Sequence, residues 1–335
     1  MPKKIEISHK TIIFTVFFLI FLSFLVAVKE IISWFFISFI IMSALKPSVD
    51  YLERHRWPRV LAILIDYVVI ILFLVFTVST IIPLLVTQTL HLAERLPVYL
   101  NLILPNININ LTDFSREISS LGQNILQVSV GIFNNIIAGF TIMVITFYLL
   151  LERAKLKGYL TQFFGTASGE KIISVFNSVE ERLGDWVRGQ LTLLLSIGLI
   201  TYIGLVLLNI PFALPLAIMA GLLEIIPTLG PILAAIPAII VSLTVSSLHP
   251  MFVALFYFII QQLENQIIVP LIMNKIVGIP PLVTILAILV GVKVGGLGGV
   301  VLAVPVMVTV ETVFTRFFLI KDAIKKPAER YSNGN

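Results

Sequence analysis

The chain of 335 residues is 58% hydrophobic and only 12% charged, with a mean hydropathy of +1.05. Soluble globular domains carry about 25% charged residues, so this composition excludes a soluble protein and places most of the chain in lipid. The net charge of +5 comes from basic residues beside apolar runs, which is typical of cytoplasmic loops and not of a nucleic-acid-binding surface.

Neither a disulfide nor a metal centre is expected. The sequence contains no cysteine, and its four histidines lie far apart without the spacing of metal ligands. We therefore expect no cofactor.

The first apolar run, residues 11–28, follows three lysines and precedes Lys29 and Glu30. A secretory signal peptide begins in the same way, but it ends in a cleavage site made of small residues. Here a second apolar run follows at once, so we expect a retained membrane helix.

Six apolar runs approach or exceed the length of a membrane span, which takes about 20 residues. They are 11–28, 31–46, 60–82, 130–151, 189–208 and 250–270. Loops rich in Lys and Arg stay in the cytoplasm. Such loops lie at the N-terminus, after the second run, after the fourth run and at the C-terminus, so both termini are expected in the cytoplasm of a cell-membrane protein.

Two segments are expected outside the lipid. Residues 83–129 are poor in Lys and Arg, which predicts a helical insert on the outer face. Residues 168–188 form an amphipathic pattern that either lies on the membrane or packs against the protein. Its apolar face comprises Ile172, Val175, Phe176, Val179, Leu183 and Trp186.

The C-terminal third contains an internal repeat. PTLGPILAAIPAIIVSLT (227–244) aligns with GGLGGVVLAVPVMVTVET (295–312) at a constant offset of 68 residues. Chance similarity between apolar segments is the alternative, but both copies share an LG pair and a proline seven residues after that glycine. These shared positions favour a true repeat.

Each copy, at 210–247 and 279–316, has two apolar arms around a break rich in glycine and proline. An arm of about 15 residues reaches about 22 Å, which is short of the roughly 30 Å hydrocarbon core. We expect two hairpins, either re-entrant or tilted. The number of crossings before each hairpin makes the two copies inverted, and interrupted helices in paired repeats are typical of a transporter's binding site.

The expected fold is therefore all-α: a polytopic membrane protein with about eight membrane segments, including two inverted-repeat broken-helix hairpins. We divide it into an N-terminal three-span bundle (1–82), the extracytoplasmic insert (83–129), the fourth span with cytoplasmic amphipathic helices (130–188), a transport core (189–320) and a cytoplasmic tail (321–335).

Glu224 lies three residues before the break of the first hairpin. A charged residue in a span costs about 2.5–3.5 kcal/mol on insertion scales, so such a residue is by default functional. Glu224 could carry a proton or a cation, or it could be a solvated carboxylate at the membrane interface. Asp66 and Glu311 are candidates for the interface.

The span between the hairpins contains a compact polar cluster in FIIQQLENQIIVP (258–270). Hydrogen bonding between helices is the structural alternative, but five polar residues in six exceed what such contacts require. We favour the lining of a site.

The candidate solute and ion pathway combines this cluster with the two breaks. Its residues are Glu224, Pro227, Thr228, Gly230, Pro231, Gln261, Gln262, Glu264, Asn265, Gln266, Lys293, Gly295, Gly296 and Gly298. Na⁺ could bind at Glu224 or Glu264, and Lys293 could pair with either carboxylate or extend to water. The sequence shows neither a nucleophile–base pair nor a phosphate-binding loop, so an enzyme is not expected.

EIIPTLGPILAAIPAII (224–240), QQLENQIIVPLIMNKIVGIPPLV (261–283) and GGLGGVVLAVP (295–305) together resemble the autoinducer-2 exporter (AI-2E) family of bacterial membrane proteins. The resemblance covers nearly the whole chain and is strongest from 186 to 312. It implies a homo-oligomeric transporter of the inner membrane. Family members are associated with export of autoinducer-2, and others with Na⁺(Li⁺)/H⁺ antiport.

The expected function is export of a small polar solute such as autoinducer-2, coupled to a proton or sodium gradient by alternating access. Glu224 and Glu264 would exchange the ion while the amide cluster orients the solute. The alternatives are a Na⁺(Li⁺)/H⁺ antiporter without an organic substrate, a passive channel, and a membrane scaffold that transports nothing. The expected partners are the bilayer, the solute or ion, and further copies of the chain.

Overall fold

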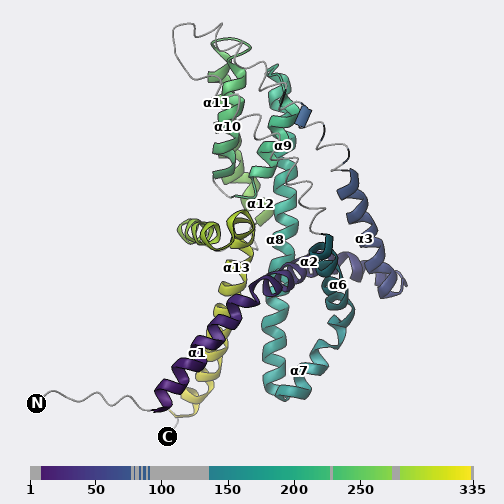
Figure 1. The fold of residues 1–335 in the computed structure, drawn as a ribbon, viewed down its shortest axis with the longest axis vertical. Helices are drawn as coiled ribbons and strands as arrows, with labels where there is room; N and C mark the ends of the chain where they lie inside the picture. The colour runs from purple at the N-terminus through teal and green to yellow at the C-terminus, as the bar shows by residue number, and fades with distance from the viewer. Residues whose placement is uncertain are drawn as a thin grey trace, which may run out of the picture.

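The computed structural model describes residues 9–76, 136–226, 229–273 and 280–332, together with a few positions between 79 and 90. Every regular element in these ranges is a helix, which confirms the expected all-α, polytopic fold (Figure 1). Most of the expected insert at 83–129 lies outside the described residues, and so do Pro227 and Thr228.

The described helices are α1 (His9–Ala27), α2 (Lys29–Arg54), α3 (Arg59–Phe76), α6 (Ile136–Glu152), η2 (Arg153–Lys155), α7 (Leu156–Phe164), α8 (Thr166–Leu207), α9 (Ala213–Leu223), α10 (Leu229–Ser242), α11 (His249–Leu263), η3 (Glu264–Ile268), α12 (Val269–Met273) and α13 (Pro281–Ser332). Six stretches of this part of the chain are long and apolar enough to cross a membrane: α2, α3, α6 with α7, α8, α11 through α12, and the second arm of α13. Large apolar side chains cover much of their outer surface, as contact with lipid requires.

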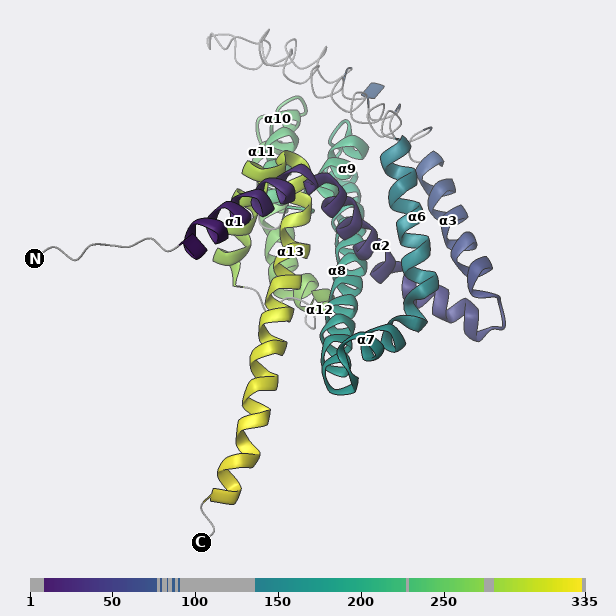
Figure 2. The ribbon, with the colours of Figure 1, turned by 60° about the horizontal axis from the view of Figure 1, so that its bottom comes forward.

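Helix α2 is the centre of the N-terminal half. It packs against α3, α6 and α8, and Figure 2 shows it between α8 and α6. Each of these four helices contributes fully buried side chains to a shared core, among them Met42, Ile63, Leu150 and Leu183. Because lipid is as apolar as these side chains, close packing holds the helices together more than transfer out of water does.

A proline inside α2 shapes its contact with α8. Pro47 has no N–H, so the carbonyl of Ser43 loses its partner within the helix. Gly184 of α8 lies directly against that carbonyl, where an added Cβ would overlap the oxygen. Arg188 of α8 donates to the next carbonyl, that of Ala44, over 3.2 Å. Helix α8 therefore packs against the interrupted part of α2.

Helix α8 is continuous for 42 residues, which corresponds to about 63 Å. The sequence suggested an amphipathic helix at 168–188 and a separate span at 189–208, but the two form one rod. The expected apolar face packs into the shared core through Val179, Leu183 and Trp186, so it lies against the protein. Ile172 at its far end is exposed.

The first hairpin consists of α9 and α10, which pack against each other, and α9 also lies along α8. With 11 and 14 residues, neither arm has the roughly 20 residues that a full span takes. The contact with α8 is close because Gly221 approaches Gly198 and the carbonyl of Leu194. Short arms were expected here, and they are found.

The second hairpin is formed by α13, which bends at Gly296 with φ 57° and ψ −137°. A positive φ of this kind strongly favours glycine. Beyond the bend the chain folds back until Gly299 touches the backbone of Gly291. The arm Gly298–Arg316 is long enough to cross a membrane, so the expectation of four short arms is wrong for this arm.

Candidate functional site

Two buried carboxyl groups meet between the first hairpin and the span that follows it. Glu224 ends α9 and is 2% exposed, and Glu264 opens the π-helical turn η3 and is 3% exposed. The two carboxyl groups lie next to each other and interact directly. The Oε2 atom of each has no hydrogen-bond partner. Two acids expected on one pathway thus lie together.

The break in the first hairpin places Glu224. Glycine at position 230 lets the start of α10 lie against the Leu223 carbonyl and the Glu224 amide, where an added Cβ would overlap both. Gly230 also donates its N–H to the Ile226 carbonyl over 2.9 Å, and Pro231 beside it is buried. The two arms therefore close around the acid.

A local change of helix type places Glu264. The five residues Glu264–Ile268 are π-helical, and Pro270 follows two residues later. Proline cannot donate a backbone hydrogen bond, so the regular ladder is interrupted at this point. Single π-helical turns inside α-helices occur frequently at functional sites. Here the turn directs one acid into the core and leaves its neighbours outside.

Gln190 of α8 completes the site, and the sequence analysis missed it. It is buried, and its Nε2 donates to the backbone carbonyl of Glu224 over 2.9 Å. Carbonyls at the end of a helix lack partners within that helix, so this bond joins α9 to α8. The available signal was the periodicity of α8, in which Gln190 shares a face with Leu193 and Ile197.

The amides of the polar cluster lie mostly on the outside. Gln261 is half-buried, whereas Gln262, Asn265 and Gln266 are exposed on the same stretch that buries Glu264. This stretch lies within a helix long and apolar enough to span a membrane. Exposed amides within a membrane span cost free energy unless water, a solute or protein faces them.

The tip of the second hairpin is exposed, whereas the acidic pair is buried. Lys293, Gly295, Gly296 and Gly298 are all exposed, and the three glycines have no other atoms near an added Cβ. Lys293 is thus placed to extend to water, whereas both carboxyl groups are buried. The two hairpins resemble each other in sequence but present different environments.

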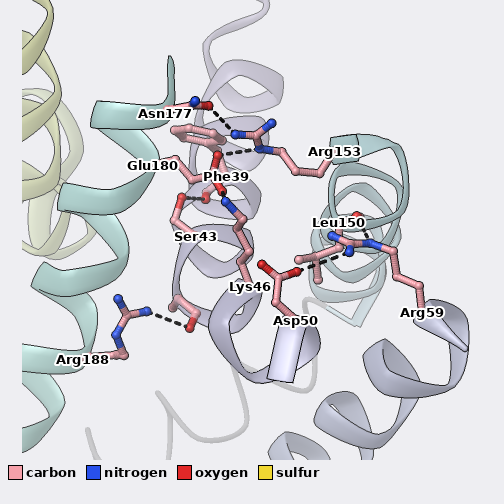
Figure 3. A network of polar contacts seen from close by, with 11 residues as sticks. Phe39, Ser43, Lys46, Asp50, Arg59, Leu150, Arg153, Asn177, Glu180 and Arg188 are labelled. Atoms are coloured by element: carbon pink, nitrogen blue, oxygen red, sulfur yellow. Dashed lines mark hydrogen bonds and ion pairs between the residues drawn. The ribbon is translucent and has the colours of Figure 1, made fainter. Parts of the chain in front are cut away.

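A third buried glutamate, Glu180 of α8, was not singled out from the sequence. Its carboxylate pairs with Lys46 of α2 and with Arg153 of η2, each over 2.6 Å. Arg153 also donates to Asn177 (Figure 3). Its guanidinium group lies over the ring of Phe176. This network ties α2, the end of α6 and α8 together and neutralises the buried charge.

Two acids considered for the membrane interface make contacts within the protein. Asp66 is buried between α3 and α2 and accepts a hydrogen bond from Ser48 over 2.8 Å. Glu311 of α13 pairs with Arg182 of α8, which also donates to Thr312 over 2.9 Å. The first contact joins consecutive helices, and the second joins helices that are far apart in the sequence.

Within the described residues, no group of three or more His, Asp or Glu side chains could hold a metal ion. The acidic pair offers two carboxyl groups, which suits a proton or a weakly held monovalent cation better than a transition metal.

The family model described as AI-2E family transporter matches residues 12–318. The chain belongs to this family. It is 28% identical over 323 residues to the putative transport protein YueF of Bacillus subtilis, covering 88% of this chain and 86% of that protein. It is 26% identical over 319 residues to YrrI of the same organism, covering 89% and 90%.

The chain is also similar to a relative with a named cargo. The AI-2 transport protein TqsA of Escherichia coli is 24% identical over 297 residues, covering 84% of this chain and 85% of that protein. The family match and these relatives, all transport proteins by name, make the chain a multi-pass membrane transport protein.

Proposed function

We propose that the chain exports a small polar solute in exchange for a proton or Na⁺, with Glu224 and Glu264 as the coupling site. The single observation that carries this proposal is the meeting of the two buried carboxyl groups, each with one unpartnered oxygen. Lys46 and Arg153 neutralise Glu180, whereas among the described residues no basic side chain forms an ion pair with Glu224 or Glu264, so a coupling ion can balance the charge of this pair.

The chemistry of the pair supports a single exchangeable ion. Two carboxyl groups in contact inside a poorly solvated core cannot both be ionised, so one proton is shared between them. When that proton leaves, two negative charges face each other unless a cation replaces it. The occupied and empty states of the site therefore differ by a full charge, which is what coupling to a gradient requires.

The solute would bind beside this pair. Gln262, Asn265 and Gln266 offer uncharged donors and acceptors next to Glu264. Such groups suit a polyhydroxylated molecule such as autoinducer-2, the cargo in the name of the relative TqsA. Loss or gain of charge at Glu264 would change how Asn265 and Gln266 are presented, because both share its π-helical turn.

Alternating access would use the first hairpin as the moving element. The hairpin is attached to α8 through the bond from Gln190 to the Glu224 carbonyl and through the contact of Gly221 with Gly198. A shift of the hairpin along the rigid α8 would break the first contact and open the pair to one side. We further propose a homo-oligomer in the cell membrane with both termini in the cytoplasm.

A Na⁺(Li⁺)/H⁺ antiporter without an organic solute is the second candidate. The free Oε2 atoms of the two glutamates favour it, because paired carboxylate oxygens suit a monovalent cation once the shared proton has left. A passive channel or a scaffold would need neither acid.

The test is a pH-gradient dye assay in proteoliposomes, with autoinducer-2, Na⁺, Li⁺ or K⁺ added to the wild type, Glu224→Gln and Glu264→Gln. Glu170→Gln is the matched control, since Glu170 is exposed on α8. The proposal expects collapse of the gradient in the wild type and the control but not in the two variants. Collapse only with Na⁺ or Li⁺ selects the antiporter, and no response in the wild type overturns coupled transport.

A further inference from the structure

Two buried hydroxyl groups near the acidic pair lack partners. Within the described residues, the buried side-chain oxygens without a hydrogen bond belong to Asp66, Glu180, Thr201, Glu224, Tyr257 and Glu264. The oxygen of Glu180 is accounted for by its ion pair with Lys46. Four of the remaining five belong to α8, the end of α9, α11 and η3, which pack together. The unmet hydrogen-bonding capacity is thus concentrated in the helices that surround the acidic pair.

Thr201 stands out among the buried hydroxyls of the described helices. Ser38, Ser43, Thr146, Ser178, Ser242 and Thr312 all donate to a carbonyl three or four residues earlier in their own helix. Thr201 is fully buried and makes no such bond. A hydroxyl that leaves a local acceptor unused is available to another partner.

Tyr257 is the second unpartnered hydroxyl, and it shares a face with Glu264. Val253, Tyr257, Ile260 and Glu264 are the buried positions of this helix. Seven residues separate Tyr257 from Glu264, which corresponds to two turns and about 10 Å toward the His249 end. The tyrosine is 5% exposed and packs among small residues of the first hairpin, including Ala234 and Ala238.

Thr201 and Tyr257 lie at a similar depth. Gly204, one turn beyond Thr201 on α8, is pressed against the ring of Phe256, the neighbour of Tyr257. Thr201 is eleven residues beyond Gln190 on the same buried face of α8. Both hydroxyls are therefore displaced from the acidic pair in the same direction, toward the helix end that the basic loops predict to be extracytoplasmic.

Few other titratable groups lie near the hydroxyls of Thr201 and Tyr257 and the acidic pair. Glu224 faces Glu264 from the end of α9, and Gln190 faces the pair from α8. In α8 beyond Gln190, and throughout α9, α10 and α12, the one titratable side chain is Tyr202, which is exposed. No charged side chain in these stretches is available to hydrogen-bond the two hydroxyls.

We propose that the hydroxyls of Tyr257 and Thr201 relay protons between the extracytoplasmic side and the Glu224–Glu264 pair, with water filling the intervals. In each step an oxygen accepts a proton from the outer neighbour and its own O–H bond breaks toward the inner neighbour, so the relay itself is unchanged. The final O–H bond forms at a carboxylate of the pair. This relay rests on the proposed function and adds the route by which the pair is loaded.

The experiment measures hydrogen–deuterium exchange of the carboxylic acid by infrared spectroscopy of the reconstituted full chain. The carbonyl band of the protonated pair is assigned by its loss in Glu264→Gln. Tyr257→Phe and Thr201→Val each remove one hydroxyl at nearly constant shape. Tyr202→Phe and Thr192→Val are matched controls, because both residues are exposed on α8.

The relay predicts that Tyr257→Phe and Thr201→Val keep the band but slow its exchange by about tenfold or more, while both controls exchange like the wild type. A positioned proton-transfer group contributes about 10²–10⁴-fold, and water replaces part of that. Wild-type exchange in both variants overturns the relay and leaves the coupling site standing. A wild type with no protonated carboxyl band overturns both.

Discussion

The described part of the chain buries glutamates in two regions and treats them in opposite ways. Glu180 lies between α2, η2 and α8, where Lys46 and Arg153 neutralise it. Glu224 and Glu264 lie between the first hairpin and the following span, where each has the other acid as its neighbour. A buried charge with paired cations is fixed, whereas two acids in contact must hold a proton or a cation that can leave. Under the proposed function, Glu180 is a structural anchor and the Glu224–Glu264 pair is the ion carrier.

Removing either member of the acidic pair is expected to have the largest effect. Glu224→Gln or Glu264→Gln is expected to reduce coupled flux to the level of empty liposomes while leaving the fold intact, because an amide cannot exchange a proton. Flux and circular dichroism on the same preparations check both parts. Coupled flux that survives in both variants contradicts the assignment of the carrier.

Removing the charge of Glu180 should instead lower the stability of the protein. Glu180→Gln leaves Lys46 and Arg153 without their buried counter-charge, so the free energy of unfolding is expected to fall by about 3–5 kcal/mol. Folded molecules should still couple flux to the gradient. Denaturant titration in detergent provides the first value, with the exposed Glu170→Gln as control. A stable Glu180→Gln that has lost coupling would reverse the two roles.

The close approach at the break can be tested by a single methyl group. A Cβ at position 230 overlaps the Leu223 carbonyl and the Glu224 amide, so Gly230→Ala is expected to cost about 1–3 kcal/mol and to lower flux by displacing Glu224. Gly139→Ala is the control, since its added Cβ meets nothing within 4 Å. Equal stability and flux in the two variants would remove the role of Gly230.

The smallest expected effect concerns the attachment of the hairpin to α8. Gln190→Leu removes the bond to the Glu224 carbonyl and should cost about 0.5–1.5 kcal/mol in unfolding free energy. Because the hairpin is then less restrained, the apparent affinity for solute or cation should change more than stability does. Titrations of flux against concentration check this, and an unchanged midpoint would make the bond purely structural.

The sequence predicted the parts of this picture that depend on local pattern. Composition and apolar runs predict a membrane bundle, and an acid inside an apolar, broken segment marks Glu224. The polar cluster around Glu264 was visible in the same way. Short arms and the break of the first hairpin follow from the positions of glycine and proline, as the contact of Gly230 illustrates.

Contacts between distant segments could not be predicted from local pattern. Glu180 lies in a stretch of ordinary charge density, so the sequence does not distinguish it from solvated neighbours. Only the contacts with α2 and η2 in the structure do so. Gln190 is one amide at the start of an apolar run, and its partner is a backbone carbonyl. The continuity of α8 was missed because hydropathy changes near residue 188 while helix formation does not.

Proton release from the purified protein tests the central claim most directly. Na⁺, Li⁺ or autoinducer-2 is added in weakly buffered detergent solution, and a pH indicator records the protons set free. A shared proton at the pair predicts release from the wild type and from Glu170→Gln, and none from Glu224→Gln or Glu264→Gln. Undiminished release from both of the latter, or no release from the wild type with any of the three, would contradict it.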